Sequence, residues 1–124
     1  MATTWLEVAR DARHAAAALV TEDRHRSAAS RAYYAAYSKI AHELVVTAGL
    51  QMARGREGPS HGSLRRLIES SMPHMAQDKR ERLSEMVGRL YTLRIDADYR
   101  PSTEFDGRDA REAFSIMKTI LEAF

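Results

Sequence analysis

The 124-residue sequence contains no cysteine, few residues that interrupt helices and no long apolar run. Without cysteine the chain can form no disulfide and perform no thiolate chemistry, which is typical of a reducing compartment. The 3 prolines and 6 glycines argue against extended disordered segments. No stretch approaches the roughly 18 apolar residues that a membrane span requires, and residues 1–7 lack the basic start and apolar core of a signal peptide. We therefore expect a cytoplasmic protein without a membrane anchor.

Motifs for a bound metal or for a phosphate-binding loop are also missing. Four of the five histidines show no paired helical spacing, and no cysteine or carboxylate cluster could complete a coordination sphere. Gly55 and Gly58 lack both the preceding strand and the lysine that a phosphate-binding loop requires. The sequence therefore predicts no metal and no cofactor.

Arginine dominates the basic residues. The net charge is only +2, but 16 of the 19 basic side chains are arginine, whose planar guanidinium suits bidentate contacts to phosphate or carboxylate. A nucleic-acid partner is one explanation. The other is a coding sequence of high GC content, which favours arginine and alanine whatever the ligand, and alanine is abundant here as well.

Hydrophobic periodicity predicts five helices and no strand. The predicted helices span about 4–20, 24–48, 60–72, 78–98 and 106–124. Residues suited to cap their N-termini are Thr4 with Glu7, Asp23, Ser60, Asp78 with Glu81, and Asp106. The third helix is expected to stop before Pro73, because a proline disfavours helical geometry in the preceding residue.

The predicted architecture is an all-α, up-and-down four-helix bundle with an additional short helix, formed by residues 1–124 as a single domain. Short connections between long amphipathic helices make chain neighbours antiparallel, and helix 60–72 is the short extra element. Helix 24–48 carries small residues on several sides, so other helices can approach its backbone closely. This pattern predicts a central helix, or one that is shared with a second subunit.

The helix predicted at 24–48 has two distinct faces. Its apolar stripe includes Tyr33, Ala36 and Tyr37, which we assign to the core. The polar line consists of Arg31, Tyr34, Ser38 and His42, spaced by three or four residues so that they share one face. This line is either a solvated helix face or a surface that binds a phosphate or a partner, and only this half of the helix is expected to be functional.

A charged pair lies beside the apolar seam of helix 78–98. Arg94 and Asp98 are four residues apart, so their side chains can touch. Because an unpaired charge next to the core is costly, the pair must be well satisfied. It is either a structural clamp or part of a site, and Tyr99 follows it directly.

Three segments occur in an order that resembles the HEPN superfamily: Ser-Arg-Ala-Tyr-Tyr-Ala-Ala-Tyr at 30–37, His61-Gly62, and Arg-Ile-Asp-Ala-Asp-Tyr at 94–99. The last segment is similar to the Arg-x-x-Ala-Asp-Tyr ending of small stand-alone HEPN proteins. The resemblance implies a helical bundle that is usually a homodimer. It also implies a minimal nucleotidyltransferase partner, with which such proteins can form a toxin–antitoxin pair.

The sequence departs from the pattern of HEPN ribonucleases. Many HEPN toxins cleave RNA without metal, using an arginine that holds the phosphate and a histidine that moves a proton, with four to six residues between the two. After Arg94 these positions hold Tyr99, Arg100 and Pro101. His61 lies at the required spacing from Arg54 and from Arg56. Two such pairs are the number expected by chance in a sequence with this many arginines and histidines.

The sequence leaves three functions open, and they differ in whether the protein is an enzyme. The first is binding of RNA, a nucleotide or a nucleotidyltransferase partner. The second is a metal-independent ribonuclease toxin with a modified site, in which Arg94 orients phosphate and Tyr99 or His61 transfers a proton. The third is a structural or regulatory helical dimer. The candidate catalytic residues are Arg94, Asp98 and Tyr99, and the candidate binding residues are Arg31, Tyr34, Ser38, His42 and His61.

Overall fold

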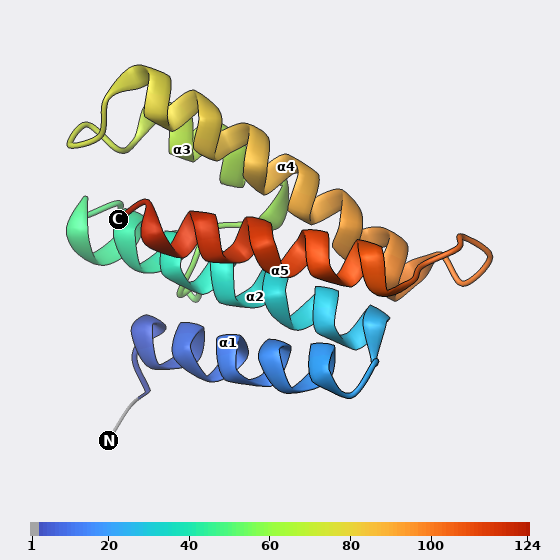
Figure 1. Cartoon of the computed structure of the whole chain (residues 1–124). Coiled ribbons are helices and arrows are strands. Elements are labelled where there is room, and N and C mark those ends of the chain that lie inside the picture. Colours follow the sequence, from blue (N-terminus) through green and yellow to red (C-terminus); the bar gives the residue numbers. More distant parts are fainter. Residues whose placement is uncertain (1–2) are drawn as a thin grey trace.

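Helices make up most of residues 3–124, which are the residues that the computed structural model describes (Figure 1). The α-helices are α1 (Trp5–Thr21), α2 (His25–His42), α3 (Leu64–Ser70), α4 (Gln77–Tyr99) and α5 (Gly107–Glu122). A π-helix, η1 (Glu43–Thr47), continues α2, and a 3-10 turn, η2 (His61–Ser63), precedes α3. The described residues contain no strand, so the predicted all-α class is confirmed.

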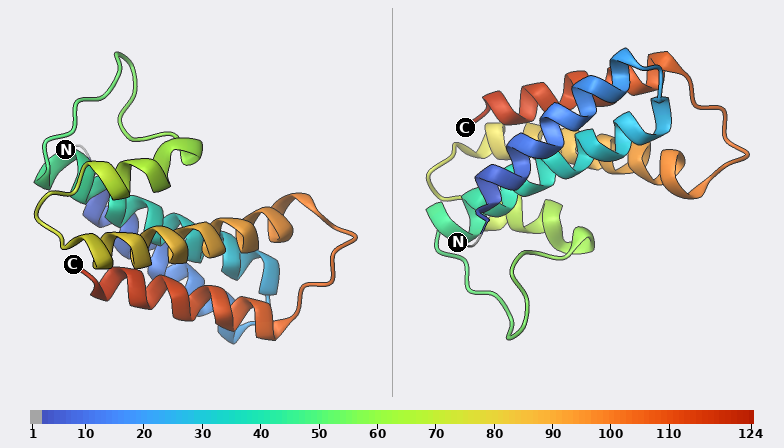
Figure 2. Two further views of the ribbon diagram at one scale, coloured as in Figure 1. Left: turned by 90° about the horizontal axis from the view of Figure 1, so that it is seen from above. Right: turned by 90° about the horizontal axis from the view of Figure 1, so that it is seen from below.

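The four long helices form an up-and-down bundle with α2 at its centre. Each of α1, α2, α4 and α5 runs antiparallel to the next, so that the start of α1 and the end of α5 lie at the same end (Figure 1). Helix α2 packs against α1, α4 and α5. The short α3 packs on α4 outside the four-helix core, as the views in Figure 2 show. This arrangement confirms the predicted bundle with one additional short helix.

Small side chains allow α2 to occupy the centre. Its fully buried alanines, each at most 2% exposed, are Ala28, Ala29, Ala32, Ala35, Ala36 and Ala41. Because a methyl group is the entire side chain at these positions, neighbouring helices can approach the α2 backbone closely. Larger buried side chains such as Ile40, Leu83 and Leu90 fill the remaining space.

Helices α1 and α5 begin where the sequence predicts. At α1 the Glu7 backbone N–H donates to Thr4 Oγ1 at 3.2 Å, and the Thr4 backbone N–H donates to the Glu7 carboxylate at 3.4 Å. At α5 the N–H groups of Arg108 and Asp109 donate to the Asp106 carboxylate. These contacts satisfy backbone donors that have no partner within the helix.

Three other predicted caps are wrong. Asp23 has a φ of 58° in the left-handed region, and α2 begins two residues later without a side-chain cap. The Ser60 hydroxyl bonds the Ser63 hydroxyl instead of capping a helix. Helix α4 begins before Asp78, whose carboxylate accepts from Arg82 at 3.2 Å. The side chains of Ser60 and Asp78 have the hydrogen-bonding capacity that the sequence indicates, but each bonds a side chain instead of capping a helix.

Arg26 connects the start of α2 to the end of α4. Its Nη1 donates to the backbone carbonyls of Asp96, Ala97 and Arg100 at 2.9, 3.1 and 3.2 Å. Its Nη2 donates to the carbonyls of residues 101 and 103 in the following turn. Carbonyls at a helix C-terminus have no partner within the helix, so this guanidinium replaces water there. The contact fixes the position of the last turn of α4.

None of the helices in the range 3–124 combines the length and the apolar character needed to cross a bilayer. Residues 1 and 2 lie outside the described range. They belong to the segment 1–7, which has no signal-peptide pattern. The assignment of residues 1–124 to a single domain stays a prediction.

Candidate functional site

The side chain of Arg94 lies between α4 and α2 and is 9% exposed. Its Nε donates to Asp98 Oδ2 at 3.2 Å, which is the contact that their spacing predicts. Its Nη2 donates to the hydroxyls of Tyr34 at 2.9 Å and Tyr99 at 3.2 Å. Ser30 donates to the same Asp98 oxygen at 3.0 Å. The buried charge therefore has the carboxylate and hydroxyl partners that it needs.

Three tyrosine rings surround the Arg94 guanidinium. Its central carbon lies 5.5 Å from the ring centre of Tyr33, 5.2 Å from that of Tyr34 and 5.3 Å from that of Tyr99. On α2 the exposed Arg31 places its own guanidinium 4.8 Å from the Tyr34 ring centre. The negative faces of aromatic rings attract cations, so the rings help to stabilise two positive charges close together.

His61 reaches this cluster from η2, far away in sequence. Its Nδ1 shares a hydrogen bond of 2.6 Å with the Tyr33 hydroxyl, and its ring centre lies 4.8 Å from that of Tyr37. Burial lowers the pKa of His61, and the positive charge of Arg94 lowers it further. Burial raises the pKa of Tyr33, so its hydroxyl keeps its proton at neutral pH. The site thus holds a neutral imidazole beside a fixed arginine.

We name this cluster the Arg94 site and define it as Ser30, Arg31, Tyr33, Tyr34, His61, Arg94, Asp98 and Tyr99. It brings together all three candidate catalytic residues and three of the five candidate binding residues. Sequence reasoning missed Ser30 and wrongly confined Tyr33 to a structural role in the core. A buried tyrosine hydroxyl usually needs a hydrogen-bond partner, and this requirement is the signal that could have indicated Tyr33.

Tyr37, which the sequence also assigns to the core, is only partly buried and supports the segment that carries His61. Its hydroxyl donates to the Pro59 carbonyl at 2.6 Å. Gly58 lies so close that a Cβ atom there would be 2.8 Å from a Trp5 ring carbon and 2.9 Å from the Tyr37 hydroxyl. A side chain at this glycine would displace the segment that leads to His61.

Two predicted binding residues lie elsewhere. Ser38 is 1% exposed, so the accessible polar line on α2 is interrupted after Tyr34. His42 is at the opposite end of α2 and lines a recess with Trp5 and Val46. A helical wheel gives the angle of a side chain about the helix axis, but the neighbouring elements decide whether that side chain is covered. The structure therefore does not bring Ser38 or His42 into the Arg94 site.

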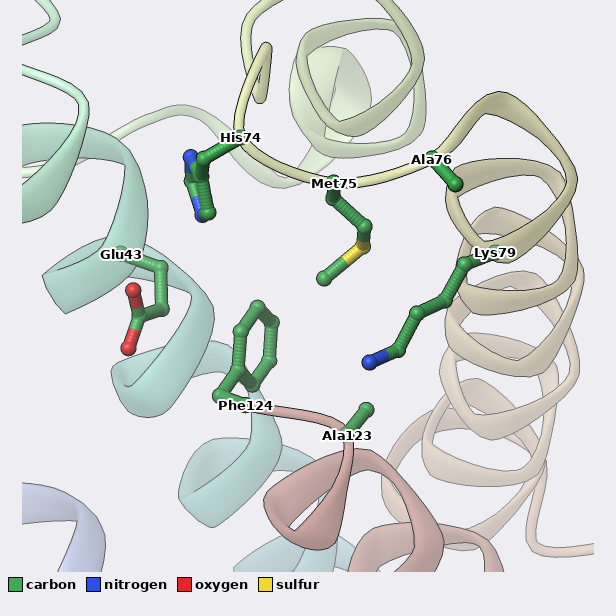
Figure 3. A pocket seen from close by; sticks show the side chains of 7 residues that line it. All are labelled: Glu43, His74, Met75, Ala76, Lys79, Ala123 and Phe124. Atoms are coloured by element: carbon green, nitrogen blue, oxygen red, sulfur yellow. The ribbon is translucent and has the colours of Figure 1, made fainter.

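A recess of about 300 Å³ lies at the other end of the bundle, where η1, the start of α4 and the end of α5 meet (Figure 3). The Phe124 ring lies between the side chains of Glu43 and Lys79. The Glu43 carboxylate already pairs with Lys39 at 3.3 Å, so its charge is compensated within the fold. This recess contains none of the residues that the sequence predicted to be functional.

Within residues 3–124 no three histidine or acidic side chains gather as metal ligands would. The chemistry available at the Arg94 site is that of a fixed cation, aromatic faces, hydroxyl groups and one imidazole. Such groups can bind an anion, stack with a flat ring or transfer a proton.

The bundle and its site define a small helical protein built around a buried arginine. The family model of the HEPN domain matches residues 2–124, so the chain belongs to the HEPN family, and the predicted resemblance is confirmed. At the level of the family, membership supports a role related to RNA or nucleotide binding, and HEPN domains commonly dimerise. No curated protein and no solved structure matches the chain.

The titration of His61 gives a prediction about stability. In the unfolded chain His61 takes up a proton near its ordinary pKa of 6.5. In the folded protein its pKa is lowered, so it takes up the proton only at a lower pH. The unfolded state then binds more protons, so stability is lost as the pH falls below about 6.5. Urea unfolding between pH 5 and 7.5 should show a shallower dependence on pH in His61→Gln.

His14 on the exposed face of α1 provides the control for this prediction. The His14→Gln variant should keep the dependence of the wild-type protein on pH. Equal slopes in the wild-type protein and His61→Gln would show that His61 titrates alike in the folded and unfolded states.

Proposed function

We propose that the protein binds RNA by holding a phosphate group at the Arg94 site. One observation carries the proposal. Nε and Nη2 of Arg94 are occupied by Asp98, Tyr34 and Tyr99, whereas Nη1 has no hydrogen-bond partner among residues 3–124 and is not sealed from solvent. The partners that hold the guanidinium in place thus leave two N–H donors for a ligand.

An anion suits these donors best. Arginine N–H groups form strong charge-assisted hydrogen bonds with phosphate oxygens, and a guanidinium that is already ordered loses little entropy on binding. Arg31 adds a second, exposed positive charge next to Tyr34, and it forms no ion pair among the described residues. The charge distribution therefore supports a polyanionic ligand with more than one phosphate.

The test is a comparison of two arginines of α4. We expect Arg94→Gln to weaken the binding of a fluorescent RNA by about 10-fold or more, because a hydrogen bond to a charged group contributes about 1.5 to 3 kcal/mol. Arg89 pairs with Glu112 in an exposed ion pair, so Arg89→Gln makes the same change in net charge away from the site. Fluorescence anisotropy in EDTA at several salt concentrations provides the measurement.

The dependence on salt distinguishes direct binding of a phosphate from an indirect effect. For single-stranded RNA, a variant that neutralises one phosphate fewer should have a slope of log affinity against log salt that is smaller by about 0.7. Since Arg94→Gln could also disturb the fold, Arg31→Gln provides a second variant at an exposed position. Unchanged affinity in both folded variants, or a salt response that is flat in the wild-type protein, would refute the proposal.

Metal-independent RNA cleavage is the second candidate function, and the position of His61 supports it. The imidazole and Arg94 contact the same Tyr33 and Tyr34 rings, and the lowered pKa keeps His61 available as a base at neutral pH. His61 would take the proton from a ribose 2′-hydroxyl, whose oxygen attacks the adjacent phosphorus. The bond to the 5′-oxygen breaks, and that oxygen takes a proton from water, leaving a 2′,3′-cyclic phosphate and a 5′-hydroxyl.

Incubation of purified protein with cellular RNA in EDTA tests this second candidate. Cleavage that is lost in both His61→Gln and Arg94→Ala would support it. Intact RNA after incubation with the wild-type protein would leave binding as the function of the site.

The family resemblance adds two further parts to the proposal. The chain would act as a homodimer in the cytoplasm, where cellular RNA is present, and its partner would be a minimal nucleotidyltransferase in a toxin–antitoxin pair. Light scattering that shows a monomer at working concentrations would refute the homodimer.

A further inference from the structure

Tyr99 is exposed to an extent that the fold does not require. The residue is 63% exposed, and it is among the few large apolar or aromatic residues that are exposed on the described surface. The other exposed residues of this kind, Leu6, Val8 and Val46, line a recess with Trp5 at the opposite end of the bundle. Among residues 3–124, only Tyr99 presents such a surface next to the Arg94 site.

The Tyr99 ring is exposed and also held in place. It occupies the last position of α4, the turn whose carbonyls Arg26 binds. Its hydroxyl accepts from Arg94 Nη2 at 3.2 Å, and its ring centre lies 5.3 Å from the Arg94 central carbon. A flat surface that is already ordered loses little conformational entropy when it binds a flat ligand.

We propose that Tyr99 stacks on an unpaired base of the RNA whose phosphate Arg94 holds, and that the site therefore selects single-stranded over double-stranded RNA. This inference rests on the proposed RNA-binding function. In RNA a base and its phosphate are separated by a single sugar. Tyr99 and Arg94 are in direct contact, so they are close enough to bind the base and the phosphate of one nucleotide. In a duplex both faces of a base are covered by its neighbours, so only an unpaired base can stack on the ring.

A second copy of the chain fits this surface less well. A two-fold symmetric contact brings the same surface patch of both copies together. In such a contact both copies would present the Arg31 guanidinium, which has no carboxylate partner among the described residues to offset its charge. An RNA strand offers flat bases for the Tyr99 ring and phosphate groups for the two guanidinium groups.

The experiment uses short single-stranded RNA in two forms, one with all its bases and one with abasic positions, together with a duplex of the same sequence. Tyr99→Leu removes the aromatic face but keeps an apolar side chain, and Tyr99→Phe keeps the face but removes the hydroxyl. We expect Tyr99→Leu to bind the strand with bases about 5- to 150-fold more weakly, the loss that corresponds to one stacked base, and Tyr99→Phe to stay near the wild-type affinity.

The abasic strand isolates the role of the base. The wild-type protein should bind it more weakly than the strand with bases, and Tyr99→Leu should not distinguish the two. The duplex should bind the wild-type protein more weakly than the single strand. Equal affinity of the wild-type protein for the strand with bases, the abasic strand and the duplex would refute stacking while leaving the phosphate contact intact.

The remaining outcomes are also decisive. If the wild-type protein binds none of these RNAs, both the proposed function and this inference are wrong. If Tyr99→Leu changes the oligomeric state in light scattering while RNA affinity is unchanged, Tyr99 contacts another subunit instead of a base. Circular dichroism of each variant verifies that the bundle is folded in these measurements.

Discussion

Replacing Arg26 with alanine is expected to lower the free energy of unfolding by about 2 to 4 kcal/mol, because hydrogen bonds to a charged group contribute about 1.5 to 3 kcal/mol each and are not additive. Several carbonyls at the end of α4 lose their donor in this variant, and only some of these carbonyls can accept hydrogen bonds from water instead. Urea unfolding followed by circular dichroism provides the measurement.

Two variants make the Arg26 prediction specific. Arg26→Lys keeps the charge but has a single nitrogen, which cannot reach all the carbonyls, so it should recover only part of the loss. Arg24 is exposed, and its side chain forms no hydrogen bond within residues 3–124; Arg24→Ala should change stability by less than about 0.5 kcal/mol. Similar losses in Arg24→Ala and Arg26→Ala would contradict the role of this contact.

Leu90→Ala should destabilise the protein by about 2 to 5 kcal/mol, since it removes buried methyl groups and leaves a cavity. Leu90 is fully buried in the core and lies one turn before Arg94 on α4. Leu6 on α1 is 36% exposed, so Leu6→Ala is a matched control with an expected loss below about 1 kcal/mol. Equal midpoints of urea unfolding in the two variants would contradict the burial of Leu90 in the core.

Local patterns in the sequence predicted most of the fold and one half of the site. The Thr4 and Asp106 caps, the seam of α4 and the Arg94–Asp98 contact each depend on residues within four positions of one another. Interactions of this range follow from helix geometry alone, so the sequence is sufficient to predict them.

The other half of the site depends on contacts between distant segments. His61 reaches Tyr33 because the preceding loop packs against Trp5 and Tyr37 at Gly58, and no spacing rule connects these positions. The acceptors of Arg26 are backbone carbonyls, which every residue has and no side-chain pattern reveals. For the same reason the wheel of α2 grouped Ser38 with Tyr34, although tertiary packing covers Ser38.

The hydrogen bond between Tyr33 and His61 has a consequence for how the site responds to partial unfolding. The groups of the Arg94 site come from α2, η2 and α4, three segments separated by long stretches of sequence. No short fragment of the chain contains all of them, and detachment of any one segment dismantles the site. Ligand binding here therefore reports on cooperative folding of the whole bundle, and a damaged or incompletely folded chain has no site with which to bind.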